Sequence, residues 1–247
     1  MIETPYNFLK GDFGKEFLKE YNERVKIDYG NNPNLHVLKQ EGDIVKGSNI
    51  FAVVLANKIL IPELLRTAVQ ADLEKILHNG ALGYDCNTYC DSGLILRDVK
   101  HGPNRYLANK LYEQLKLRNS GINLPILINP YDLNLVKDSD SDYGISFKLA
   151  GGANPLYVPA LHRHREDFDE DYFYSPAKPD IEVNFNDENI DPKTGLPLPD
   201  QTGKGYRTLS ATIFGLSRLS SRGRNIYSNI GDLAKSDLEG RIVVVKN

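Results

Sequence analysis

The apolar run at residues 50–55, Ile-Phe-Ala-Val-Val-Leu, constrains the fold most, because six consecutive apolar side chains have to be buried. Its length and its β-branched residues are typical of a strand that is covered on both faces. The wider apolar stretch at residues 50–61 contains Asn57 and Lys58 and is too short to cross a bilayer as a helix. The sequence therefore predicts a buried strand at residues 50–55.

Amphipathic helices are expected on either side of this run, within the first 120 residues. Asp12 is the expected N-cap of a helix that reaches about Val25 and buries Phe13, Phe17 and Tyr21. A short strand is expected at residues 36–38. A third helix is expected over about residues 103–117, because three leucines recur there at helical spacing, namely Leu107, Leu111 and Leu115.

Between these two helices, a second helix is expected over about residues 63–77. Pro62 suits its first turn, and His78-Asn79-Gly80 is a stop signal. Its expected buried residues are Leu65, Val69, Leu73 and Ile76. Its expected solvent-facing residues are Glu63, Arg66, Gln70 and Glu74.

The character of the chain changes near residue 121, since nine of its 13 prolines fall between residues 121 and 200. Short strands separated by loops are expected there, at residues 124–128, 133–136, 145–149, 157–161, 181–185, 206–214 and 241–245. The sequence thus predicts an α+β fold with a helix-rich first half. The second half is expected to hold an antiparallel or mixed β-sheet with long Pro/Gly-rich loops. A single domain over residues 1–247 is favoured over a boundary near residue 120, because the run at 50–55 needs partners from the second half.

The charge balance, 30 Lys+Arg against 33 Asp+Glu, gives a formal net charge of −3. This excludes a globally basic nucleic-acid coat and an acidic solvating tail. The first residues resemble no signal peptide, so the expected location is the cytoplasm or a particle assembled there. Cys86 and Cys90 are interpreted as thiols, with a local disulfide or half of a metal site as alternatives. Abundant Asn and Tyr and the absence of Trp suggest an AT-rich genome.

Acidic residues at alternate positions resemble half of a calcium loop at Asp138, Asp140 and Asp142. Gly144 comes one residue late for such a loop, and its twelfth position holds Leu149 where a glutamate would be needed. The favoured interpretation is a hairpin with a polar tip between two strands. The same interpretation applies to a second set of similarly spaced residues, Asp187, Asn189 and Asp191, which precedes the turn sequence Pro-Lys-Thr-Gly.

His162 and His164 would lie on one face of an extended strand, which is a usual way to offer two metal ligands. Four acids that follow could complete a ligand set: Glu166, Asp167, Asp169 and Glu170. The favoured interpretation of the segment is nevertheless a solvated charged loop, which could bridge to a neighbour. This segment is the best enzymatic candidate in the chain.

Residues 201–231 contain five basic residues and no acid: Lys204, Arg207, Arg218, Arg222 and Arg224. Arginines and backbone amides in a glycine-rich segment could hold phosphates, although the lysine lacks the Ser or Thr that a P-loop requires after it. The favoured interpretation is a basic surface that pairs with an acidic one, such as residues 166–171, within the fold or across a subunit contact.

No complete catalytic or cofactor signature is present, so no cofactor is expected. The favoured function is a non-catalytic structural subunit of a multi-subunit particle, for example a virion-like one, that contacts copies of itself or other subunits. Two alternatives stay open. One is a metal-dependent hydrolase that uses His162 and His164, and the other is a phosphate or nucleic-acid binding module that uses residues 201–231.

Overall fold

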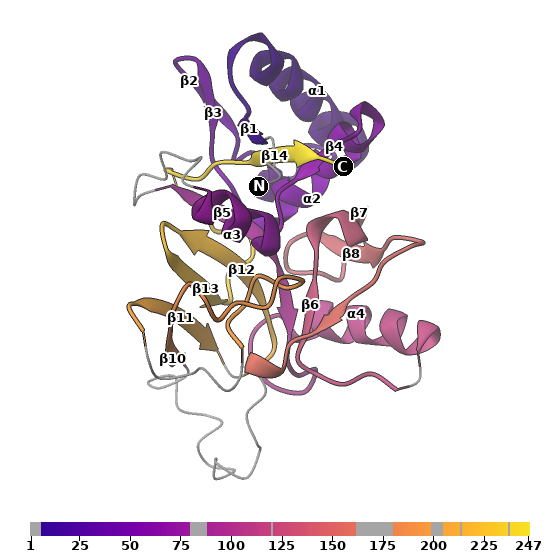
Figure 1. The fold of residues 1–247 in the computed structure, drawn as a ribbon. Coiled ribbons are helices and arrows are strands. Elements are labelled where there is room, and N and C mark those ends of the chain that lie inside the picture. The colour runs from indigo at the N-terminus through magenta and orange to yellow at the C-terminus, as the bar shows by residue number, and fades with distance from the viewer. Residues whose placement is uncertain are drawn as a thin grey trace.

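The computed structural model describes residues 6–79, 88–119, 121–161, 180–198, 205–212, 214–236 and 238–247. Within these residues, four helices and fourteen strands form an α+β fold, as the sequence predicts (Figure 1). All four helices precede residue 120, and they are α1 (Gly11–Tyr29), α2 (Ile50–Leu60), α3 (Gln70–His78) and α4 (Arg105–Arg118). No helix in this part of the chain is both long enough and apolar enough to cross a membrane.

The apolar run at 50–55 is the first part of α2, so the prediction of a strand there is wrong. Asn49 caps this helix, because its side-chain oxygen accepts a hydrogen bond of 2.8 Å from the Ala52 backbone N–H. All residues of α2 except Lys58 are buried. A helix that is apolar on every side has no amphipathic period, and such a run cannot be told from a buried strand by periodicity.

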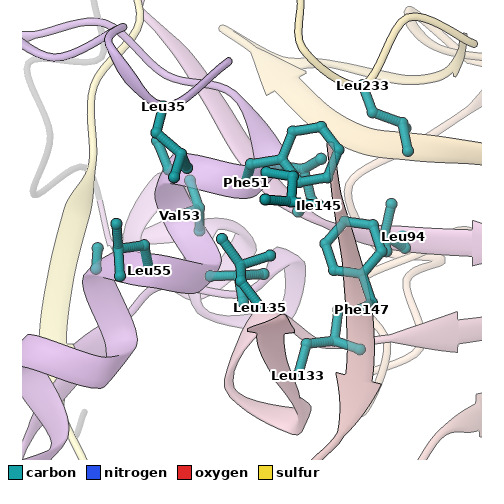
Figure 2. Packing of buried hydrophobic residues seen from close by; sticks show 14 of the residues in the cluster. Leu35, Phe51, Val53, Leu55, Leu94, Leu133, Leu135, Ile145, Phe147 and Leu233 are labelled. Atoms are coloured by element: carbon teal, nitrogen blue, oxygen red, sulfur yellow. The ribbon is translucent and has the colours of Figure 1, made fainter. Parts of the chain in front are cut away.

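Packing around α2 draws on both halves of the chain (Figure 2). Phe51 stacks on Phe147 with ring centroids 5.1 Å apart, and it also contacts Tyr143 at 5.0 Å. The same cluster of buried residues includes Leu35 and Leu94. Residues on both sides of position 120 therefore enclose one helix.

The largest sheet has seven strands in the order β10-β11-β13-β12-β5-β6-β9. They are β10 (Asp180–Phe185), β11 (Arg207–Thr212), β13 (Asn225–Ile230), β12 (Leu216–Arg222), β5 (Tyr89–Leu96), β6 (Ile126–Ile128) and β9 (Leu156–Tyr157). The β11–β13 pair is parallel and the other pairs are antiparallel, so the sheet is mixed. Of the strand expected at 157–161, only the first residue is in β9, because Pro159 begins a 3-10 helix, η4 (Pro159–Leu161).

A second sheet holds the two ends of the described chain together. Its central strand β14 (Val243–Lys246) lies between β1 (Tyr6–Phe8) and β4 (Leu65–Thr67), and both pairs are antiparallel (Figure 1). The C-terminal strand is confirmed, and its partners were not predicted. Two hairpins complete the β-structure, β2 (Lys39–Glu41) with β3 (Ile44–Lys46) and β7 (Leu133–Lys137) with β8 (Ile145–Leu149).

Two of the three expected helices are confirmed with shifted ends. α1 begins at Gly11 after an N-cap at Lys10, so Asp12 is in its first turn, and it continues to Tyr29. Phe17 and Tyr21 are buried as expected, whereas Phe13 is 38% exposed. Residues 36–38 are not a strand, because Pro33 begins a 3-10 helix, η1 (Pro33–Leu35), that ends in a turn.

The prediction of a single helix over residues 63–77 is wrong for the first half of that range. Pro62 belongs to a 3-10 helix, η2 (Ile61–Glu63), which ends at Leu64 with φ of 57°, and β4 follows before α3 begins. Leu73 and Ile76 are buried as expected. Gln70 and Glu74 are also buried, contrary to the expectation that they face solvent, because they meet polar partners on the large sheet.

Shortening a buried side chain of α2 should lower the free energy of unfolding more than removing a surface contact of the same helix. We expect Leu55→Ala to lower the free energy of unfolding by about 2–5 kcal/mol, because it leaves a cavity in a closely packed core. Lys58→Ala removes only a partly exposed ion pair with Asp28 and should cost less than about 1 kcal/mol. Urea unfolding followed by circular dichroism measures both. Equal costs for the two variants would contradict this account of the core.

Candidate functional site

The segment that carries the enzymatic hypothesis lies outside the described residues. This holds for His162, His164 and the acids that follow them, and also for Cys86 and Lys204. Cys90 is buried on β5, where it packs with Leu73, Ile76 and other apolar residues. In the part of the chain that is described, no group of three or more His, Cys, Asp or Glu side chains is placed to hold a metal ion.

Asp138 lies at the β7–β8 hairpin, as the favoured interpretation expects. Its carboxylate accepts hydrogen bonds from the Lys110 Nζ at 2.6 Å and from the Tyr106 hydroxyl at 2.9 Å. Burial raises the pKa of this carboxyl, but the bonds from Lys110, Ser146 and Tyr106 outweigh that effect and lower its pKa to about 2. Asp138 thus joins the hairpin to α4.

Asp191 forms a local turn. Its carboxylate accepts hydrogen bonds from the Lys193 backbone N–H at 3.0 Å and from the Thr194 hydroxyl at 2.9 Å. Gly195 has φ of +70°, and a Cβ there would lie 2.5 Å from the backbone of Gln70 and Ala71. Only glycine allows this close approach, so the turn is fitted against the start of α3.

Arg207 is the centre of a buried ionic cluster between the large sheet and α3. Its side chain is 1% exposed and pairs with both carboxylate oxygens of Glu74, at 2.7 and 2.8 Å. It also donates to Asp187 at 2.9 Å. Burial lowers the pKa of Arg207, but the two carboxylates raise it above its ordinary value. This arginine therefore stays charged and is committed to the interior.

Gln70 extends the cluster through hydrogen bonds without further charge. Its amide nitrogen donates to Glu74 at 2.9 Å, and its oxygen accepts from Ser92 at 3.0 Å and from Ser221 at 2.7 Å. α3 is thus joined to β5 and β12 by side chains whose polar groups are paired, which is the condition under which burying them is tolerable.

Arg218 is also directed inward. It lies 3.5 Å from the Asp91 carboxylate, stacks over the Tyr89 ring at 5.2 Å and donates to the Lys235 carbonyl. Asp91 in turn accepts hydrogen bonds from Ser48 at 2.6 Å and from the Tyr89 hydroxyl at 2.8 Å. Two of the basic residues in segment 201–231 are therefore internal structural cations.

Arg97 is a buried cation of a different kind. Its two terminal nitrogens donate to the hydroxyls of Ser217 at 2.8 Å and Ser228 at 2.6 Å, and no carboxylate among the described residues pairs with it. Its Nε finds no hydrogen-bond acceptor within the described part of the chain. Burial lowers the pKa of this guanidinium to about 9. No local sequence pattern identifies Arg97 as a buried cation, because its serine partners are more than 100 positions away.

The other arginines of segment 201–231 lie at the surface. Arg222 and Arg224 flank Gly223 in the turn between β12 and β13. The Arg224 side chain is 60% exposed, and its guanidinium carbon lies 5.5 Å from the ring centre of Tyr206, which is itself 61% exposed. Tyr206 donates a hydrogen bond to Asp187. We call Tyr206, Arg222, Gly223 and Arg224 the arginine tip.

The surface of the described residues is hollowed in two places that are relevant to a binding site. One, of about 620 Å³, follows the charged outer face of α1, and the other, of about 290 Å³, lies between the start of α4 and the β7–β8 hairpin. The second is lined by Arg105, Tyr106, Asp142 and their neighbours. Neither hollow brings together a nucleophile, a base and an orienting group, which is the arrangement that nucleophilic catalysis needs.

Removing one partner of the buried Glu74–Arg207 ion pair should lower the free energy of unfolding strongly, whereas removing both partners should lower it only slightly. We expect Glu74→Leu to lower the free energy of unfolding by about 3–5 kcal/mol, because it leaves the Arg207 charge short of a partner. Adding Arg207→Met should recover most of this loss. Arg224→Ala is the control, since its exposed ion pair should contribute less than about 1 kcal/mol. Thermal and urea unfolding of the three proteins measure this. An additive loss in the double variant would contradict it.

The Asp138 contact should make stability depend on pH in acid. Because folding lowers the pKa of Asp138 from 3.8 to about 2, its contribution is present above about pH 4 and is lost as the pH falls towards 2. Asp138→Asn should therefore cost about 1–2 kcal/mol at pH 7. The difference from the wild-type chain should shrink between about pH 4 and pH 2. A difference that stays constant over this range would contradict the assignment.

Comparisons of the chain with protein-family models, with curated proteins and with solved structures give no match. No relative therefore supplies a family, a substrate or a partner for this chain. The arrangement of its own side chains is the basis on which its function has to be inferred.

Proposed function

We propose that this chain is a non-catalytic structural subunit that assembles with further copies of itself into a larger particle. The location of its arginines supports this proposal, since Arg207 and Arg218 are committed to internal pairs. The observation that carries the proposal is an exposed apolar corner at η2, where residues 61–64, Ile-Pro-Glu-Leu, are all exposed.

Leu64 is the central residue of this corner. Its side chain is 74% exposed, and its backbone has φ of 57°. The other two non-glycine residues with positive φ among those described are Asn31 and Asn104, and asparagine tolerates this conformation. Leucine in the left-handed region costs about 1–2 kcal/mol.

Burial of its own side chain offsets little of that cost, because Leu64 is 74% exposed. The backbone is nevertheless held in place, since the Leu64 carbonyl accepts a hydrogen bond of 2.9 Å from the N–H of Asn247. A strained residue that is held firmly and projects an apolar side chain points to an external contact. A neighbouring subunit would bury Leu64 and Ile61 together.

Native mass spectrometry of the untagged chain, with and without a chelator, tests the function. The proposal predicts an oligomer whose mass includes no metal. A small species that carries a chelator-sensitive ion would contradict it and would favour the hydrolase alternative through His162 and His164. A bare monomer at every concentration would also contradict it.

Replacement of Leu64 should separate stability from assembly. We expect Leu64→Asn to raise the free energy of unfolding of the subunit by up to about 1 kcal/mol, because asparagine tolerates the left-handed backbone. The same change should weaken assembly, because it removes the apolar contact. Denaturant unfolding and sedimentation velocity measure the two effects.

Leu238→Asn is the matched control, since Leu238 is an equally exposed leucine, 80% exposed, outside the corner. This variant should change neither the stability nor the assembly. If Leu64→Asn raised the free energy of unfolding and left assembly unchanged, Leu64 would be a locally strained residue without a role in assembly, and the proposed role of the corner would be refuted.

A further inference from the structure

The smaller of the two hollows lies where the first turn of α4 meets the tip of the β7–β8 hairpin. α4 packs beside β8, which brings these two parts of the chain together (Figure 1). Residues 104–107 at the start of α4 and residues 141–143 of the hairpin line the hollow. Its volume of about 290 Å³ is at the lower end of the range for small-molecule sites.

The backbone N–H groups in the first turn of α4 are available to a ligand. Asn104 is at the N-cap, but its side chain makes no capping hydrogen bond. Its amide nitrogen donates instead to the carbonyls of Leu216 at 2.7 Å and Gly231 at 2.6 Å, and its oxygen accepts from the Tyr143 hydroxyl at 2.8 Å. The N–H groups of residues 105–107 therefore have no acceptor in the described part of the chain.

The charge at this end of α4 is the opposite of the one that stabilises a helix. Anions are favourable at a helix N-terminus, because the unpaired N–H groups give it a partial positive charge. The first turn of α4 has no acidic residue, and it begins with Arg105. Arg105 is exposed and lines the hollow. An anion in the hollow would pair with the N–H groups and with this guanidinium.

Ser141 is an observation, independent of the helix, that points to a ligand. It lines the hollow and is only 6% exposed. Its oxygen accepts a hydrogen bond of 3.2 Å from the Tyr143 N–H, but its hydroxyl hydrogen has no acceptor among the described residues. Because a buried donor without an acceptor is costly, this hydroxyl favours an acceptor that enters the hollow from outside.

Asp142 brings a negative charge to the same hollow. It is exposed on the hairpin and lines the hollow beside Ser141. Its carboxylate would repel phosphate or another simple anion, but it would attract an ammonium group. The hollow therefore combines donors for an anionic group with an acceptor for a cationic group.

We propose that this hollow binds a small zwitterion, a free α-amino acid, with its carboxylate at the first turn of α4 and its ammonium group at Asp142. Tyr106 and Tyr143 also line the hollow and would contact the rest of the ligand. The hydroxyl of Tyr106 is fixed by a hydrogen bond of 2.9 Å to Asp138, so this wall is formed in advance. The inference goes beyond the structural function, because the site requires no second subunit.

Isothermal titration calorimetry of the full chain tests the site with simple probes. From a panel of free L-amino acids, we expect at least one to bind with a dissociation constant below about 1 mM. Acetate and methylammonium each carry one of the two charges, and each should bind at least about tenfold more weakly. Inorganic phosphate should also bind more weakly than the amino acid, because Asp142 repels it.

Two substitutions distinguish the two charged groups of the ligand. Asp142→Asn should weaken amino-acid binding at least about tenfold, whereas it should strengthen acetate binding. Arg105→Gln should weaken the binding of both probes. The matched controls are Asp140→Asn and Lys116→Gln, which remove the same charges at exposed positions that do not line the hollow. Both controls should bind like the wild-type chain, and circular dichroism checks that every variant is folded.

Each outcome supports or overturns the proposal. If no amino acid binds at concentrations up to about 10 mM, the proposal is refuted. If acetate or phosphate binds as tightly as the amino acids, and Asp142→Asn has no effect, the hollow is an anion site and the zwitterion is refuted. If the controls lose binding as strongly as Asp142→Asn and Arg105→Gln, the ligand is not in this hollow. Failure of these titrations leaves the structural function standing, and a monomeric chain leaves this site standing.

Discussion

The fold depends on the enclosure of α2, a helix whose every residue except Lys58 is buried. An amphipathic helix needs cover on one side only, whereas this helix requires cover in all directions. α1, the β7–β8 hairpin, β4 and β5 supply that cover, and they come from distant parts of the sequence. Because β4 pairs with β14, which pairs with β1, the strands near the two ends of the described chain belong to the same enclosure. The other elements of this core are therefore arranged around α2.

A second, polar layer joins α3 to the large sheet. Apolar packing alone would leave this helix free to rotate or slide, since apolar contacts have little directionality. The two oxygens of Glu74 on Arg207 and the oxygen of Gln70 between Ser92 and Ser221 fix both its position and its rotation. Such networks add little net stability but penalise alternative arrangements.

The sequence predicts those elements whose burial is one-sided. The stripe at Phe17 and Tyr21 identifies α1, leucines identify α4, and alternating apolar residues identify β7 and β8. The strand prediction for residues 50–55 is wrong because burial on all sides removes the helical period of apolar and polar residues. β5 and β12 are missed because serines and charged residues occupy their buried positions. Those polar residues are tolerated only through distant partners such as Gln70, which is 151 positions from Ser221, and no local pattern contains that information.

Burial also decides what the basic segment can do. In the sequence its arginines are equivalent, and together they resemble a phosphate-binding surface. In the structure Arg207 and Arg218 are neutralised inside, where a buried charge requires a fixed partner. Arg222 and Arg224 remain at the surface because they lie in the turn between two strands. A segment that alternates between interior and turn thus places one kind of residue in two environments. Its inner arginines pair with buried carboxylates, whereas its outer arginines are exposed at the turn.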